Sequence, residues 1–150
     1  MGHTYTNLLF HIIFSTKNRL PYLRDEMRDD VFAYMGGIAR KIGATCLTVG
    51  GHDDHVHLLS KLPASLAMAD FTNKVKTNSS RWIHQKRVLH RAFGWQEGYA
   101  ALSVSESSAD AVSRYIANQA KHHQKKTFQE ELIEFLKRHR IPYDERYIWR

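Results

Sequence analysis

The sequence lacks several features that would place the chain in a common class of protein. It has a single cysteine, Cys46, and no window approaches the run of about 18 apolar residues that crosses a membrane. The first residues do not form the basic stretch followed by an apolar stretch that is typical of a secretory signal. Internal repeats and low-complexity linkers are also missing. We therefore expect one domain, residues 1–150, that lies in the cytoplasm and has no membrane partner.

Acidic residues are in short supply as well. The chain has 22 lysines and arginines against 15 aspartates and glutamates, a formal net charge of +7 at pH 7, and its 10 histidines add positive charge at mildly acidic pH. This surplus favours a polyanionic partner, with nucleic acid ahead of an anionic membrane surface. Because 43% of the residues are hydrophobic, an ordered core is expected rather than disorder.

Hydrophobic periodicity predicts an alternation of strands and helices. The order is strand, helix, strand, strand, helix, strand, helix, which is typical of the ferredoxin-like split βαβ fold, an α+β fold with a central antiparallel sheet. Two crossover helices would cover one face of this sheet and leave the other for a site or a partner. The core would take up about residues 1–127, and residues 128–150 would add a C-terminal helix and a tail. The strands are expected at residues 5–15, 45–49, 55–62 and 100–105, and the helices at residues 25–42, 65–86 and 109–126.

Two histidines, His55 and His57, follow a hairpin loop of sequence Gly-Gly-His-Asp-Asp. Alternate residues of a strand share one face and lie roughly 6.5–7 Å apart, so both imidazoles can converge on one metal ion. A polar strand face with two solvated histidines is the alternative interpretation. Asp54 is a candidate hydrogen-bond partner for one of the imidazoles, although a role in the turn is the simpler interpretation. His11, in the first strand, is expected to pack rather than to bind a ligand.

Tyr115 and Gln119 form a second polar pair, on the helix predicted after the last strand. Residues four apart project from the same face of a helix, one turn from each other. This spacing is common on ordinary helices and indicates little by itself. His122 and His123 continue the same face, and we expect them to meet DNA or solvent rather than to bind a metal.

Together the two pairs resemble the motifs of the single-tyrosine HUH transposases of the insertion sequence 200/605 family. That family carries His-hydrophobic-His on a central strand and Tyr-x-x-x-Gln on a later helix. His55-Val56-His57 and the segment from Tyr115 to Gln119 match both motifs in the same order. The similarity includes FSTK at residues 14–17, GHDDHVHLL at residues 51–59 and WQEGY at residues 95–99, and it covers essentially the whole chain. REP-associated tyrosine transposases share this core.

The resemblance implies an HUH endonuclease-type fold and a DNA transposase that cuts and rejoins single-stranded DNA by metal-assisted transesterification. Tyr115 would be the nucleophile and would form a 5′-phosphotyrosine intermediate. His55, His57 and Gln119 would hold a divalent metal, Mg²⁺ or Mn²⁺. The implied partners are hairpins at the ends of the mobile element and a second copy of the chain in a homodimer.

Basic side chains gather in two further segments that could contact DNA phosphates. One is the loop after the first strand, and the other is the second predicted helix. A basic loop is more often merely solvated. A solvated face is also the alternative for the helix, but there the number of basic residues tilts the interpretation toward contact. The candidates are Lys17 and Arg19 in the loop and Lys74, Lys76, Arg81 and Arg87 on or next to the helix.

Two other functions fit parts of the pattern. A nicking nuclease of the relaxase or replication-initiator type shares the HUH chemistry, but such domains are usually larger and often carry paired tyrosines. A non-catalytic, domesticated nucleic-acid-binding protein of ferredoxin-like fold is the alternative from another class. Against it, the third strand carries histidines in place of the aromatic signature of RNA-recognition domains. A purely structural metal site is disfavoured, because two histidines and a glutamine leave the coordination open.

Overall fold

A four-stranded antiparallel sheet forms the centre of the protein in the computed structural model, which describes residues 2–86, 88–123 and 125–149. Its strand order is β2-β3-β1-β4, so β3 and β1 are the inner strands. This order and the interleaved helices confirm the predicted ferredoxin-like α+β fold. The strands are β1 (Leu8–Ser15), β2 (Thr45–Gly51), β3 (His55–Leu62) and β4 (Ala100–Ser103).

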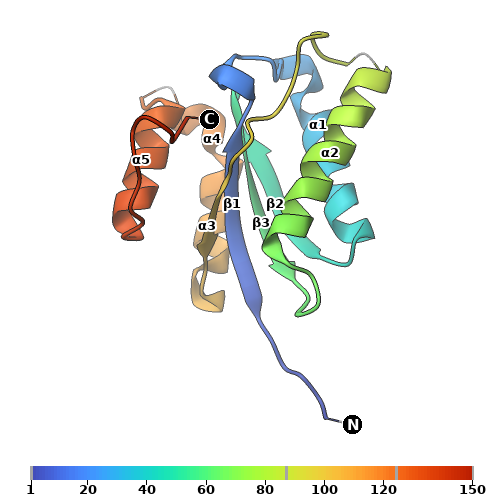
Figure 1. Cartoon of the computed structure of the whole chain (residues 1–150), viewed down its shortest axis with the longest axis vertical. Helices are drawn as coiled ribbons and strands as arrows, with labels where there is room; N and C mark the ends of the chain where they lie inside the picture. The colour runs from blue at the N-terminus through green and yellow to red at the C-terminus, as the bar shows by residue number, and fades with distance from the viewer. Residues whose placement is uncertain (1, 87, 124, 150) are drawn as a thin grey trace.

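The helices lie in two layers, one on each side of the sheet (Figure 1). On one side are α1 (Asp25–Lys41) and α2 (Met68–Lys86), and on the other are α3 (Ala109–Ala117), α4 (Gln119–His122) and α5 (Phe128–Arg138). Short 3-10 turns, Lys17–Arg19 and Glu106–Ser108, follow β1 and precede α3. Over the described ranges no helix combines the length and apolar character that a membrane crossing needs.

Alternation along β1 and β3 sends side chains to both faces of the sheet, and each face is covered by its own helices. The larger core lies between the sheet and the α1–α2 layer. Helical spacing puts Val31 and Met35 of α1 into this core, and Phe71, Val75 and Ile83 of α2 meet them there. From the sheet it takes Ile12, Phe14, Val56 and Leu58.

The opposite face of the sheet is covered by the helices that follow β4. Ile116 of α3 packs on Leu9 and Leu59, whereas Phe128, Leu132 and Leu136 of α5 pack on Ile13 and Leu102. Between these two clusters the sheet presents polar residues rather than apolar ones. This gap in the apolar surface is the location of the candidate site.

Several boundaries differ from those predicted. The first strand begins at Leu8 and the second helix at Met68, both three residues later than expected. The helix predicted over residues 109–126 is wrong in extent, because it ends at Ala117 and a separate turn of helix runs from Gln119 to His122. The break at Asn118, whose φ is −97° and ψ is 19°, separates the helix of Tyr115 from that of Gln119.

Candidate active site

His55 and His57 lie at the start of β3, on the face covered by α3, α4 and α5, and both are 0% exposed. Each imidazole is held from behind through its Nδ1 atom. His55 Nδ1 is 2.7 Å from Asp54 Oδ1, and His57 Nδ1 is 2.7 Å from Nε2 of His11 on the neighbouring strand β1. The Nε2 atoms of both histidines therefore point away from the strand and into the site.

The tyrosine helix approaches this strand closely because β2 carries a glycine where α3 crosses it. A Cβ atom at Gly50 would lie 2.5 Å from the carbonyl oxygen of Ile116 and 2.9 Å from its Cγ2, so only glycine allows the contact. Ile116 is the neighbour of Tyr115. The close packing of α3 on Gly50 thus fixes how near the Tyr115 hydroxyl lies to the histidines. The Gln119 amide, which follows the break at Asn118, is placed by the same contact.

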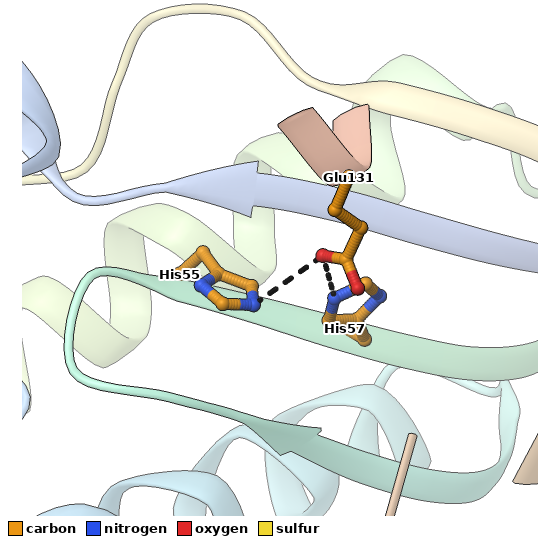
Figure 2. Close-up of side chains that lie close together, drawn as sticks. All are labelled: His55, His57 and Glu131. Carbon is orange, nitrogen blue, oxygen red and sulfur yellow. Dashed lines mark hydrogen bonds and ion pairs between the residues drawn. The ribbon is translucent and has the colours of Figure 1, made fainter. Parts of the chain in front are cut away.

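Glu131 of α5 connects all of these groups, and Figure 2 shows its contacts with the two histidines. Its Oε1 atom faces the histidine pair, 3.0 Å from His57 Nε2 and 3.6 Å from His55 Nε2. Its Oε2 atom accepts a hydrogen bond from the Tyr115 hydroxyl and another, at 3.1 Å, from Gln119 Nε2. The four residues that the sequence singles out as catalytic or metal-binding are thus brought together in one chain, around a carboxylate that was not predicted.

His122 and His123 complete the group. Their Nε2 atoms are each 3.3 Å from an oxygen of Glu131, and His123 Nε2 also lies 2.9 Å from Gln119 Oε1. The His123 side chain is only 5% exposed. The expectation that both histidines face DNA or solvent is therefore wrong for His123, while His122 is partly exposed.

Burial and hydrogen bonding shift the pKa values within this group. Burial lowers the pKa of His57 to about 4, although its hydrogen bond to Glu131 acts in the other direction. Burial, reinforced by His57, lowers the pKa of His11 to about 3. Burial disfavours ionisation of Glu131, but hydrogen bonds from His123 and His57 outweigh this and hold the pKa of the carboxyl well below its usual range. Burial and then the hydrogen bond to Glu131 raise the pKa of Tyr115 above its usual range.

The donor set fits a divalent cation. In its neutral form His55 gives its only N–H, on Nδ1, to Asp54, so Nε2 carries a lone pair. His55 Nε2 lies 2.8 Å from Gln119 Oε1, and this oxygen is also a hydrogen-bond acceptor. Two acceptor atoms that face each other with no proton between them repel, and a cation bound by both would remove this repulsion. Adjacent ligands of an octahedral ion with bonds of about 2.1 Å lie about 3 Å apart, which is close to the spacings found here. His55, His57 and Glu131 form a candidate His-His-Glu metal cluster whose ligand atoms all lie within 4.8 Å of one another.

The cations predicted to contact DNA lie elsewhere. Lys74, Lys76 and Arg81 are on α2, across the sheet from the histidines. The Lys76 ammonium donates hydrogen bonds to the carbonyls of Gln96, Glu97 and Gly98 at 2.9, 3.2 and 2.6 Å, and burial lowers its pKa to about 8. Lys76 therefore holds the segment before β4 in place.

The other predicted cations have separate surroundings. Arg19 donates a hydrogen bond of 2.7 Å to the backbone carbonyl of Trp149, and its guanidinium lies 5.3 Å from the centre of the Trp149 ring. Lys17 lines a cavity of about 380 Å³ with Trp95 and Trp149. Arg81 donates to Asn78, and Arg87 lies outside the described residues. DNA contact by these cations stays a prediction.

One feature of the sequence could have indicated a buried role for Glu131. The apolar stripe of α5 runs through Phe128, Leu132 and Phe135, and Glu131 occupies a position on this buried face. A charged residue on the apolar face of a helix needs a partner inside the protein. Glu130 and Glu131 together, however, look like acidic residues that favour the start of a helix, and Glu130 does form a capping box with Thr127.

Comparison with protein families identifies a transposase. The family model described as "Transposase IS200 like" matches residues 4–119, well over half of the chain. The chain belongs to this family. The match ends at Gln119, so α5 and Glu131 lie beyond the matched segment.

Individual relatives agree with the family. The chain is 29% identical over 123 residues to the ISDra2 transposase TnpA of Deinococcus radiodurans, covering 79% of this chain and 87% of that one. It is 27% identical over 129 residues to the transposase for insertion sequence element IS200 of Salmonella typhimurium, covering 79% and 81%.

Two solved structures share the fold. A crystal structure of a Deinococcus radiodurans R1 protein has a TM-score of 0.62 and 28% identity, and the match covers 79% of this chain and 96% of that one. A REP-associated tyrosine transposase bound to a REP hairpin has a TM-score of 0.59 at 13% identity, covering 82% and 73%, a likeness of fold alone.

Proposed function

We propose that this transposase cuts and rejoins single-stranded DNA by metal-assisted transesterification, with Tyr115 as the nucleophile. The observation that supports this most is that a single carboxylate of one chain contacts the Tyr115 hydroxyl, the Gln119 amide and the imidazoles of His55 and His57. Membership of a transposase family supports the reaction class.

In the proposed reaction the Tyr115 oxygen attacks the scissile phosphorus. A bond between that oxygen and phosphorus forms, the bond to the 3′ oxygen breaks, and that oxygen leaves as a 3′-hydroxyl after taking up a proton. The phosphodiester energy is kept in the 5′-phosphotyrosine, so rejoining needs no nucleotide hydrolysis. Glu131 accepts the hydrogen bond of the attacking hydroxyl and is the carboxylate placed to receive its proton.

His55, His57 and Gln119 would hold the metal, with Glu131 as a further oxygen ligand. A divalent ion held there would polarise the phosphate and stabilise the charge on the leaving 3′ oxygen. Imidazole nitrogens favour Mn²⁺, whereas amide and carboxylate oxygens suit Mg²⁺. His11 would position His57 for this role. With Nε2 as a metal ligand, the one N–H of neutral His57 would lie on Nδ1 and donate to His11 Nε2, in place of the hydrogen bond that Nε2 now makes with Glu131.

The proposed substrate carries hairpins, as at the ends of a mobile element, and the proposed assembly is a homodimer. A protein of the same fold has been solved with a REP hairpin bound. The outer strands of the sheet are β2 and β4, and a dimer that joins the two sheets would use one of these edges. Light scattering of the purified protein tests the assembly, since it should give twice the mass of one chain.

Incubation with end-labelled single-stranded DNA from the flanks of its own gene tests the proposed reaction. With Mn²⁺ or Mg²⁺, the wild-type protein should retain the label on a denaturing protein gel. Tyr115→Phe and His57→Ala should both lose the labelled band, whereas Tyr147→Phe, at an exposed tyrosine, should keep it. DNA binding without a labelled band under either metal would instead support the non-catalytic binding protein.

A further inference from the structure

A cleft of about 560 Å³ opens beside the tyrosine helix, at the end of α4. One wall is formed by Tyr115 and Asn118 and the rest by a short basic run. Its lining residues are Tyr115, Asn118, Lys121, His122, Lys125 and Lys126, and we call it the lysine cleft.

The lysine cleft leads toward the buried catalytic group. A smaller cavity of about 180 Å³ shares Tyr115, His122 and Lys126 with it and also reaches Glu131. His55 and His57 are 0% exposed and Gln119 is 1% exposed, so solvent does not reach them directly. Tyr115 is partly exposed and lines both cavities. A phosphate that meets the tyrosine hydroxyl from this side therefore brings the adjoining strand over the lysine cleft.

The charge of the cleft is available for a ligand. Lys126 is already paired, since its ammonium lies 2.6 Å from both carboxylate oxygens of Glu134. Lys121 and Lys125 are exposed, and neither forms an ion pair with a described residue. Lysine is a compact, mobile charge that suits the phosphates of a flexible strand rather than one rigid anion.

The basic residues of α2 cannot serve the same part of the strand. They lie on the other side of the sheet from Tyr115, behind the larger core. Lys76 is moreover engaged by three backbone carbonyls. Contacts to phosphates next to the scissile one must come from the face that carries the tyrosine. Lys121 and Lys125 lie on that face and form no ion pair with any residue that the structure describes.

We propose that the lysine cleft binds the backbone of single-stranded DNA next to the scissile phosphate, with Lys121 and Lys125 contacting its phosphates. The proposal rests on the proposed function for the identity of the strand and extends it to substrate-binding residues outside the two motifs. The recognition is electrostatic, so it positions the strand without reading its bases.

The first test measures binding without chemistry. A fluorescent, unstructured single-stranded oligonucleotide is titrated with the full chain in EDTA at several salt concentrations, and anisotropy is recorded. The double variant Lys121→Ala/Lys125→Ala should bind at least about tenfold more weakly at low salt. Its plot of log affinity against log salt should be shallower by about 1.4, because each single-strand phosphate contact contributes about 0.7.

The control is Lys41→Ala/Lys137→Ala, which removes the same charge at two exposed lysines that line neither cavity. It should bind like the wild type. A third variant, Lys74→Ala/Arg81→Ala, tests the α2 face. An unchanged affinity and salt slope for the cleft variant, or a loss confined to the α2 variant, would overturn the proposal.

A second test needs no substitution. Amine acetylation followed by peptide mass spectrometry, with and without the oligonucleotide, should show protection of Lys121 and Lys125 but not of Lys41. Equal labelling in both conditions would contradict the proposal. A wild type that binds through the cleft and forms no covalent product with metal would overturn the proposed reaction alone, whereas a cleft variant that binds normally would overturn the cleft alone.

Discussion

Glu131 contributes a negative charge and two oxygens at the point where the histidines, the glutamine and the tyrosine meet. In Glu131→Gln the side chain keeps its volume and one acceptor oxygen but loses the charge. We expect the affinity for Mn²⁺ to fall at least about tenfold, which corresponds to about 1.4 kcal/mol of lost interaction with the ion. Isothermal titration calorimetry of the full chain measures it.

The matched control for this prediction is Glu134→Gln, on the same helix. Glu134 is exposed and pairs with Lys126, and it belongs to neither candidate metal cluster, so its loss should leave Mn²⁺ affinity unchanged. Thermal melting of both variants shows whether α5 is still in place. Equal Mn²⁺ affinities for the wild type and a folded Glu131→Gln would contradict the assignment of Glu131 as a ligand.

His11 and His57 make stability depend on pH. Their pKa values in the folded protein are about 3 and about 4, against an ordinary value of 6.5. Between pH 6.5 and about 4 the unfolded chain binds protons at these residues that the folded chain does not. The contribution of these two histidines to the free energy of unfolding is therefore fully present above pH 6.5. It falls on acidification, by at most about 1.4 kcal/mol per pH unit for each histidine.

Urea unfolding in EDTA at pH 7.5, 6.5, 5.5 and 4.5 measures this dependence. His11→Gln removes one of the two groups, so the free energy of unfolding should fall less steeply with acidity than in the wild type. Parallel curves for the two proteins would show that His11 is not the buried neutral imidazole that the structure places beside His57.

Among the elements, the contact between β2 and α3 sets the position of Tyr115, the proposed nucleophile. In Gly50→Ala the new methyl group would meet the carbonyl oxygen of Ile116, which is backbone and cannot rotate away. The expected cost is about 1–3 kcal/mol of stability, as for overpacking elsewhere. Because α3 must shift to relieve the contact, the yield of the covalent DNA product should fall as well.

Gly37→Ala is the control for this prediction. Gly37 lies inside α1, and a Cβ atom there would have nothing within 4 Å, so alanine should stabilise the helix by about 0.5–1 kcal/mol. Guanidinium unfolding of both variants measures the difference. A Gly50→Ala protein as stable and as active as Gly37→Ala would contradict the role of this contact.

Some element bounds could be predicted from the sequence and others could not. The bounds of β3 agree with the prediction, because a turn sequence precedes the strand and Pro63 follows it. The helix of Tyr115 was extended through Asn118, because asparagine does not stop a helix as proline does and the residues beyond it continue the pattern. Glu131 was missed because its role depends on where α5 packs, a tertiary contact that no local spacing encodes.

At the scale of the whole molecule, two kinds of contact with DNA would be carried on opposite faces of the sheet. The face covered by α3, α4 and α5 holds the candidate active site and the lysine cleft. The face covered by α1 and α2 holds Lys74 and Arg81. The family match stops at residue 119, so the helix that supplies Glu131 lies beyond the segment shared with the family model.

In the proposed reaction Tyr115 becomes covalently joined to DNA at this site. The most direct measurement is mass spectrometry of the covalent product after nuclease trimming and proteolysis. The nucleotide remnant should lie on the tryptic peptide that starts at Tyr115, and only when Mn²⁺ or Mg²⁺ was present. A remnant on another tyrosine, or a metal-independent one, would contradict the account.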